Sequence, residues 1–142
     1  EIYVQDAERK QSLAEAEERA LDYVKAHVPA VRRAPLAGNS SATARGFLAR
    51  DMPMREGHLD YRMVDVSSIK ELVRRWFPRV YFNSPAKTGN HRALGDIKDS
   101  ITELKFYRQT IFVPHPGPYT DTVRAIAAQY APPGLIVPEG PG

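Results

Sequence analysis

The chain has 142 residues, of which 42% are hydrophobic and 26% charged, so we expect one soluble domain or part of one. It contains no cysteine, which excludes disulfide scaffolds, thiolate zinc sites and cysteine nucleophiles. No run approaches the roughly 18 apolar residues that a membrane-spanning helix needs, and the N-terminus lacks the pattern of a signal peptide.

Charge is distributed unevenly along the chain. Residues 1–31 carry four Lys or Arg against seven Asp or Glu, residues 32–108 carry fifteen against eight, and residues 109–142 carry one against two. A basic centre between acidic ends favours an anionic partner, such as a phosphate, a nucleotide or a nucleic acid. The alternative is that the arginines only solvate exposed faces.

The first part of the chain predicts an extended stretch and a helix. Residues 1–6 alternate apolar and polar side chains and are weakly strand-like. Ser12 and Glu15 form a capping-box pattern, and the apolar spacing that follows predicts a helix over 13–27, which Pro29 ends.

Two strands are each expected to lead into a helix. Residues 34–38 predict a short strand, and the polar side chains at 39–41 can cap the helix that follows. Residues 61–66 predict a better strand, and the capping pattern from Ser67 to Glu71 starts a second helix. The apolar face of this second helix comprises Ile69, Leu72, Val73 and Trp76.

The rest of the chain is expected to be mainly helical. Residues 79–90 are rich in Pro, Gly, Asn and Lys and predict a loop. A long helix is expected over 92–108 and a short one over 122–130, whereas the Pro/Gly-rich stretch 131–142 is expected to be a flexible tail. The apolar side of the long helix comprises Leu94, Ile97, Ile101 and Leu104.

This order of elements predicts an α/β fold, with one domain over 1–130 and two parallel strands. A two-stranded sheet is too small to stand alone, because three or more strands are normally needed. Either residues 1–6 supply a third strand, or a partner chain does.

Three places could carry chemistry, and the first is the strand end at residues 38–41. Backbone amides at a strand end that leads into a helix favour an anion, although ordinary capping is the alternative. At the second place, Arg62, Ser67 and Lys70 could converge on a helix start and hold a terminal phosphate. Arg62 could instead pair with Asp60 or Asp65 and bind nothing.

The third place is the start of the long helix. His91 could act as a general base and Asp96 as a metal ligand. Taken alone this is a weak signal, because magnesium needs several oxygen ligands. Asp99 lies one turn further on and could pair with Arg92 or Lys98 instead.

Taken together, these segments resemble the C-terminal two-thirds of an oligoribonuclease, a 3′→5′ exonuclease of short RNA. One matching stretch is Gly-Asn-His-Arg-Ala-Leu-Gly-Asp at 89–96, and the segment at 112–118 resembles actinobacterial members. The resemblance implies a partial RNase H-like exonuclease fold that is helix-rich, with a sheet of two to three strands, and a cytoplasmic location. The other matching stretches are 35–40, 47–53, 61–72, 74–76 and 103–108.

The resemblance also implies a site. Enzymes of this family, named DEDDh for four acidic residues and a histidine, use two divalent cations, Mg²⁺ or Mn²⁺. His91 matches the residue that deprotonates the attacking water, and Asp96 matches the last metal-binding acid. Ser40, Ser67 and Lys70 match the pocket for the 5′ phosphate of a dinucleotide.

Two further residues, Tyr61 and Arg62, match positions that the second subunit of a homodimer contributes in this family. The resemblance therefore implies a homodimer that binds a short RNA or a 5′-phosphorylated dinucleotide.

The departures from the family concern the acids above all. The family begins with an Asp-x-Glu strand that residues 1–6 do not match, and Ala44 stands where its middle motif has Asp. Asp60 replaces the usual His before Tyr-Arg. Of the four acidic positions only Asp96 remains, so we expect a very poor nuclease with weak or absent metal binding.

Three hypotheses follow. The favoured one is an inactivated or truncated relative that keeps a surface for nucleotides or 5′ phosphates. A second is a working exonuclease that another chain or absent segments complete. A third is a homologue recruited to a different reaction or to a structural interaction role.

Overall fold

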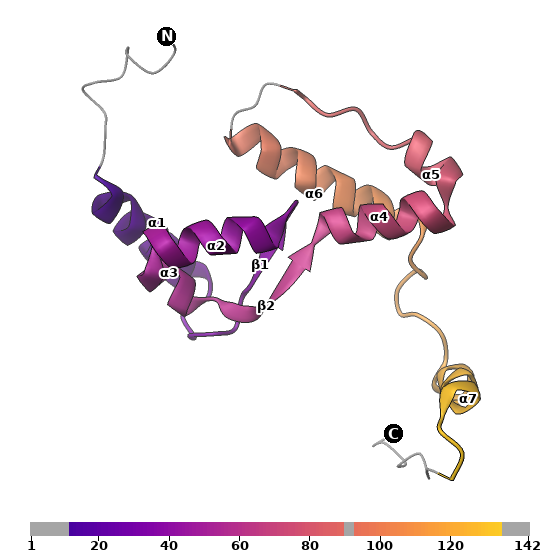
Figure 1. The fold of residues 1–142 in the computed structure, drawn as a ribbon. Helices are drawn as coiled ribbons and strands as arrows, with labels where there is room; N and C mark the ends of the chain where they lie inside the picture. Colours follow the sequence, from indigo (N-terminus) through magenta and orange to yellow (C-terminus); the bar gives the residue numbers. More distant parts are fainter. Residues whose placement is uncertain (1–11, 90–92, 135–142) are drawn as a thin grey trace.

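The computed structural model describes residues 12–89 and 93–134 of the chain (Figure 1). The predicted extended stretch 1–6 lies outside them. Within the described residues, no helix is long and apolar enough to cross a membrane. The elements in chain order are α1 (Leu13–His27), β1 (Pro35–Gly38), α2 (Ser41–Asp51), α3 (Pro53–His58), β2 (Asp60–Asp65), α4 (Val66–Trp76), α5 (Pro78–Phe82), α6 (Ala93–Thr110) and α7 (Thr120–Tyr130).

β1 and β2 pair as parallel strands, as the order of elements predicts. Leu36 lies opposite Met63, and Gly38 lies opposite Asp65. The helices α2 and α3 form the crossover that two neighbouring parallel strands require. In the described part of the chain these two strands are the whole sheet, so the prediction of a helix-rich α/β fold with a small sheet is confirmed.

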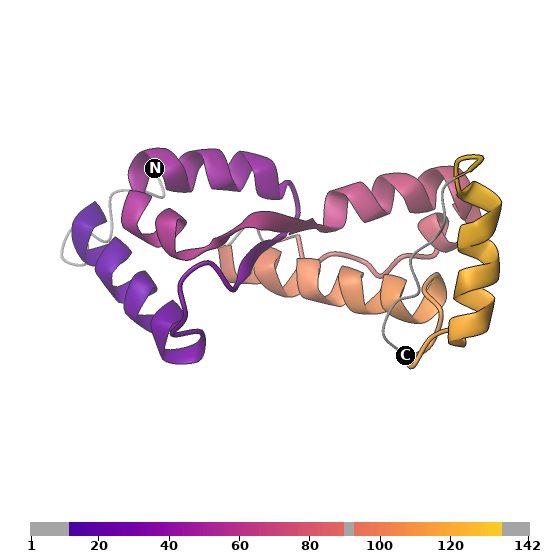
Figure 2. The same cartoon turned by 90° about the horizontal axis from the view of Figure 1, so that it is seen from below.

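The helices gather at the two ends of this sheet (Figure 1, Figure 2). Helices α1, α2 and α3 lie at one end, whereas α4, α5 and α6 extend toward the other, and α7 stands beyond them. Every residue of α7 is exposed. The sheet therefore links two groups of packed helices, and α7 belongs to neither.

The N-terminal helices are held by capping across elements. Ser12 and Glu15 form the predicted capping box, with the Glu15 N–H donating to Ser12 Oγ at 3.2 Å. Glu17 Oε1 accepts hydrogen bonds from the backbone N–H groups of Met54 (2.7 Å) and Arg55 (3.2 Å). A carboxylate of α1 thus satisfies amides at the start of α3 that have no partner within their own helix.

The hydrophobic core lies between α4 and α6. Its buried members are Val66 and Val73 of α4 and Tyr107 of α6. Burial of an apolar side chain of this size contributes about 1.5–3 kcal/mol, so these residues fix the position of α6 against α4. The partly buried residues packed against them are Ile69, Val80, Tyr81, Leu104, Phe106 and Ile111.

Local details at two helix starts and in one loop differ from the prediction. α4 begins earlier than expected because Asp65, not Ser67, is its N-cap and accepts from the Ser67 N–H at 3.0 Å. At the start of α2, the N-cap Ser40 makes no side-chain capping bond, since its backbone is left-handed with φ of 53°. The predicted loop over 79–90 is wrong in its first residues, which belong to α5.

The predicted apolar faces of α4 and α6 are buried only in part. The described elements pack against one side of each helix and leave the rest of the apolar face open. On α6 this leaves a buried Glu103 beside exposed isoleucines, the reverse of the usual amphipathic arrangement. The predicted core residues that are exposed are Leu72, Trp76, Leu94, Ile97 and Ile101.

Candidate functional site

The structure brings the two strand-to-helix junctions together. The carboxyl ends of β1 and β2 are level, because Gly38 lies opposite Asp65. Ser40 follows β1, and Ser67 lies in the first turn of α4 after β2. The Ser40 N–H donates to Ser67 Oγ at 3.0 Å. Two sites that the sequence suggests separately are therefore one.

Asp65 satisfies the amides of this junction. One oxygen of its carboxylate, Oδ1, accepts from the N–H of Ser40 (3.1 Å) and from the N–H of Ser67 (3.0 Å). The Ser40 amide is one of those at 38–41 that the sequence suggests for an external anion. An incoming anion must therefore share this amide with Asp65 or replace Asp65. The Ser40 hydroxyl makes no capping bond, so it is available to a ligand.

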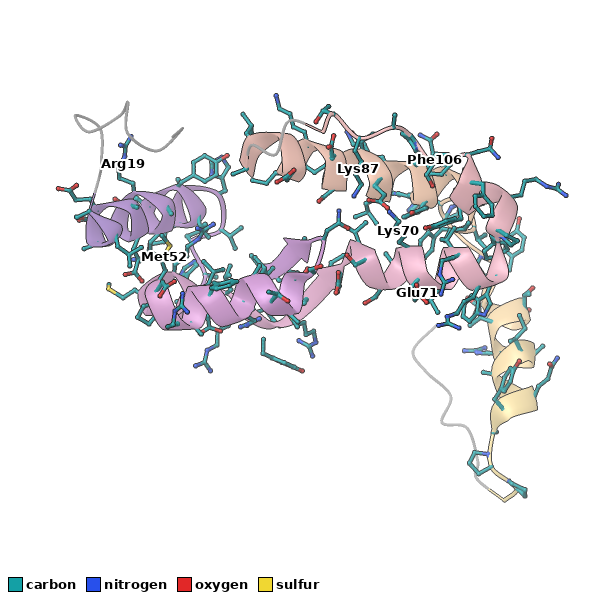
Figure 3. The ribbon with its side chains drawn as sticks, turned by 45° about the horizontal axis from the view of Figure 1, so that its top comes forward. Arg19, Met52, Lys70, Glu71, Lys87 and Phe106 are labelled. Carbon is teal, nitrogen blue, oxygen red and sulfur yellow. The ribbon has the colours of Figure 1, made fainter. Side chains whose placement is uncertain are left out.

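A buried carboxylate, Glu103 of α6, ties this junction to the helices around it. The residue is only 6% exposed. Its oxygens accept from Tyr107 Oη at 2.8 Å and from Asn39 Nδ2 at 3.4 Å. Lys70 Nζ lies 3.4 Å from Oε1 and Lys87 Nζ lies 3.6 Å from Oε2 (both lysines are labelled in Figure 3). Lys70, which the sequence suggests as a phosphate ligand, is thus held by an internal anion.

The network continues from Glu103 to the serines. Asn39 Oδ1 accepts from Ser67 Oγ at 3.3 Å, and Asn39 Nδ2 also donates to Ser100 Oγ at 3.0 Å. Burial by itself raises the pKa of the Glu103 carboxyl group, but the bond from Tyr107 and the two lysines outweigh it, so the pKa lies below its usual value. Burial and the bond to Glu103 raise the pKa of Tyr107 to about 12.

Sequence reasoning missed Glu103. A charged residue on a helix is normally read as exposed, because burial of a charge without partners is strongly unfavourable. The available signal is the spacing of Glu103 and Tyr107, which at i and i+4 share one face of α6.

A cavity of about 600 Å³ lies beside the junction, between β1, α2 and α6. Asp96 lines it from the first turn of α6, and Ala44 lines it from α2. The position where the resembled family has its middle acid therefore faces the same space as Asp96. The remaining lining residues are Leu36, Ala37, Gly38, Asn39, Ser41, Val66, Lys87, Ile97, Asp99, Ser100, Ile101 and Leu104.

The described residues do not supply the ligands of a divalent metal centre. No group of three or more His, Cys, Asp or Glu lies together in 12–89 and 93–134. Asp99 shares the cavity with Asp96, and its carboxylate accepts from the N–H and the hydroxyl of Thr88, each at 3.1 Å. Of the two partners considered for Asp99, Arg92 lies outside the described residues. His91 lies outside the described residues. A pair of adjacent divalent cations needs more oxygen donors than this.

Tyr61 and Arg62 lie apart from the junction. Arg62 stacks over the ring of Tyr61 at 4.6 Å, and its Nη1 lies 3.6 Å from Asp60 Oδ2. Both side chains are exposed on β2. Arg62 precedes the strand end by three residues, about 10 Å at the usual rise of a strand. Within one chain, the predicted convergence of Arg62 with Ser67 is not formed.

Comparison with known proteins identifies the family. A family model described as an exonuclease, RNase T, matches residues 2–104. The chain belongs to the RNase T exonuclease family. Among curated relatives, the chain is 62% identical to the oligoribonuclease of Streptomyces griseus over 122 residues, which are 86% of this chain and 61% of that protein.

Two other relatives agree with this. The chain is 63% identical to the oligoribonuclease of Streptomyces coelicolor over 119 residues, covering 84% of this chain and 60% of that protein. It is 59% identical to the oligoribonuclease of Rhodococcus jostii over 121 residues, which are 85% of this chain and 61% of that protein. The resemblance to oligoribonucleases is confirmed, and this chain spans about 60% of the length of these relatives.

Proposed function

We propose that this chain is the substrate-binding part of an oligoribonuclease-like 3′→5′ exonuclease, and that it binds a short RNA through its 5′ phosphate. The observation that carries the proposal is the hydrogen-bonded junction of Ser40 and Ser67 at the level ends of two parallel strands. Ligands of open α/β sheets bind at the carboxyl ends of the strands.

The groups around this junction suit a terminal phosphate. Ser40 and Ser67 carry hydroxyl donors, and Lys70 lies one turn further along α4 with its side chain about one-third exposed (36%). Hydrogen bonds from charged donors to phosphate oxygens are about twice as strong as neutral ones. The phosphate would take Lys70 from Glu103, which keeps the hydrogen bonds from Tyr107 and Asn39.

We propose His91 as the general base and Asp96 as a catalytic metal ligand of the reaction, with Mg²⁺ or Mn²⁺ as cofactor. Asp96 lines the cavity, and Ala44, which stands where a second acid would be needed, lines it as well. The proposal therefore includes weak cation binding and little or no hydrolysis by this chain alone, because loss of one member of a cooperating catalytic set removes most activity.

A second candidate function is a working exonuclease that further segments complete. The unpaired edge of β1 favours this candidate. β1 pairs with β2 along one edge, and the described residues provide no strand for the other. The half-exposed Ile97 and Ile101 line the cavity beside that edge. An added strand would pair with β1 and cover both isoleucines.

A homodimer is part of either candidate. Tyr61 and Arg62 are exposed and lie away from the junction of their own chain, so we propose that they act on the substrate bound by a second subunit. Light scattering tests this: we expect twice the chain mass, and a strictly monomeric solution would contradict it.

Calorimetry with and without a 5′ phosphate on the same dinucleotide tests the binding proposal. We expect the phosphorylated ligand to bind about tenfold more tightly, since a hydrogen bond to a charged group is worth about 1.5–3 kcal/mol. Ser67→Ala should remove most of this preference. Ser68→Ala is the matched control, because Ser68 is exposed on the same turn. No heat at millimolar ligand would overturn the proposal.

Incubation with a labelled dinucleotide and Mn²⁺ separates the two candidates. This chain alone should give no turnover above buffer under either candidate, so the assay is repeated with the segments or the partner chain that would complete the exonuclease. No turnover even then would support the substrate-binding part. Turnover that His91→Ala abolishes would instead support the complete exonuclease.

A further inference from the structure

We propose that Lys87 is a further substrate-binding residue, which contacts the phosphate that joins the two nucleotides of a short RNA. This inference rests on the proposed function, because it assigns the 5′ phosphate to Ser40, Ser67 and Lys70. The sequence gives no indication of this role, because Lys87 lies in a stretch predicted as a loop. The indication comes from the position of Lys87 in the fold.

Lys87 is placed at the wall of the large cavity. It lines the 600 Å³ cavity together with Asp96, the proposed catalytic residue. The next residue along the chain, Thr88, donates from its N–H and its hydroxyl to the carboxylate of Asp99, each at 3.1 Å. These bonds fix the segment before α6 against α6 itself. The backbone that carries Lys87 is thus held at the cavity rather than free to leave it.

The charges around Glu103 allow Lys87 to reach a ligand. Its Nζ lies 3.6 Å from Glu103 Oε2, and its side chain is 52% exposed. A buried carboxylate that loses all its partners is strongly destabilised, but Glu103 also accepts from Tyr107 Oη at 2.8 Å and from Asn39 Nδ2 at 3.4 Å, and neither donor is assigned to the substrate. Lys87 can therefore turn toward an anion in the cavity without leaving Glu103 without hydrogen-bond donors.

The two lysines serve different parts of the substrate. Lys70 lies one turn after Ser67, beside the proposed site of the 5′ phosphate. Lys87 shares the cavity with Asp96, where the phosphodiester to be cleaved would lie. An ammonium group, with three donors on a flexible stem, suits the two free oxygens of an internucleotide phosphate.

Binding of two ligands tests this assignment. A 5′-phosphorylated dinucleotide contains both phosphates, whereas a nucleoside 5′-monophosphate lacks the internucleotide one. With metal chelated to prevent turnover, we expect Lys87→Gln to weaken dinucleotide binding about fivefold to tenfold and to leave monophosphate binding unchanged. The slope of log affinity against log salt for the dinucleotide should fall by about 0.7, the contribution of one phosphate contact on a single strand.

Two variants complete the test. Lys87→Arg keeps the charge and should bind the dinucleotide within about twofold of the wild type. Lys98→Gln removes the same charge from an exposed position of α6 that does not line the cavity, and it should change neither the affinity nor the salt slope. Circular dichroism melting of Lys87→Gln checks that the chain still folds.

The outcomes separate this inference from the proposed function. Equal binding of the dinucleotide by wild type and Lys87→Gln would overturn the inference while leaving the 5′-phosphate site intact. An equal loss for both ligands would also overturn it, because Lys87 would then act on the 5′ phosphate or on the fold. Absence of phosphate-dependent binding by the wild type would overturn the proposed function, and this inference with it.

Discussion

The polar junction at the strand ends and the apolar side of α6 are neighbours, and they are packed in opposite ways. At the junction, Glu103 is 6% exposed and has four donors around it. On the other side, Ile97 and Ile101 are half exposed and line an open cavity. Residues 12–89 and 93–134 thus complete the interactions of the polar site and leave an apolar surface uncovered.

This difference separates the part of the described fold whose side chains have all their partners from the part whose apolar side chains remain exposed. A buried carboxylate needs all its partners present, since a charge without partners in the interior is strongly unfavourable. Exposed isoleucines only forgo the 1.5–3 kcal/mol that burial of each would contribute. The junction is therefore a finished unit, whereas the side of α6 along β1 is the place where further structure would add stability.

The largest expected effect comes from Glu103→Ala. It removes the shared partner of two lysines, a tyrosine and an asparagine. We expect the free energy of unfolding to fall by about 3 kcal/mol, as when one partner of a buried ion pair is removed. Urea denaturation measures this. Ile101→Ala, on the open side, is the comparison and should change stability by less than about 1 kcal/mol; a larger loss for Ile101→Ala than for Glu103→Ala would reverse the comparison.

Tyr107→Phe should have the next largest effect. It removes the hydrogen bond to Glu103, and we expect a loss of about 1 kcal/mol near neutral pH. The effect depends on pH, because the pKa of Tyr107 is raised from 10 to about 12 by burial and by Glu103. A raised tyrosine pKa stabilises the fold below pH 10, and this stabilisation is lost as pH rises toward 12.

Stability measured against pH tests this sign. Wild type should lose more stability than Tyr107→Phe between pH 10 and 12. Parallel curves for the two proteins over that range would contradict the assignment.

Ser40→Gly should have a smaller effect of opposite sign. Ser40 has a left-handed backbone with φ of 53°, which is unfavourable for a residue with a Cβ atom. We expect the glycine variant to be more stable by about 0.5–1 kcal/mol while it binds the 5′-phosphorylated dinucleotide less tightly, because the hydroxyl is lost. Thermal melting and calorimetry on the same sample check both. A destabilised variant would show that the Ser40 side chain stabilises the unliganded fold.

The smallest effect is expected for Ile97→Ser on the open side. Its side chain is 56% exposed, so the free energy of unfolding should change by less than about 0.5 kcal/mol. Denaturant melting measures the change, and a loss above 2 kcal/mol would mean that this side of α6 is already covered in solution.

Much of the fold was predictable because its signals are local. The Ser12–Glu15 capping box, Pro29 and the apolar spacing between them define α1. Likewise, the strand-helix-strand order predicts that β1 and β2 are parallel, because a helical crossover returns the chain to the same end of the sheet. The start of α4 was misplaced because Asp65 and Ser67 are both good capping residues, and the choice depends on the Ser40 amide that Asp65 also binds.

The site was harder to predict because its contacts join distant parts of the sequence. Asn39 meets Ser100 and Glu103 across more than 60 residues, and no local pattern encodes that meeting. The apolar side of α6 is predicted to face the interior, as it does in a helix that is covered by other elements. Here Ile97 and Ile101 lie on the side that the described residues leave open.

The position of Asp65 has a consequence for selectivity. Its carboxylate already accepts from the Ser40 and Ser67 amides, so a ligand meets donors that are engaged rather than vacant. A phosphate bound as proposed would have to share these amides with Asp65 or displace its carboxylate, and an anion that displaces the carboxylate gains only the difference between the two interactions. Under the proposed function, we expect small inorganic anions such as sulfate to gain little from such a displacement. A nucleotide, whose sugar and base would add contacts elsewhere, should gain more, so an acid that the protein itself supplies would discriminate against simple anions.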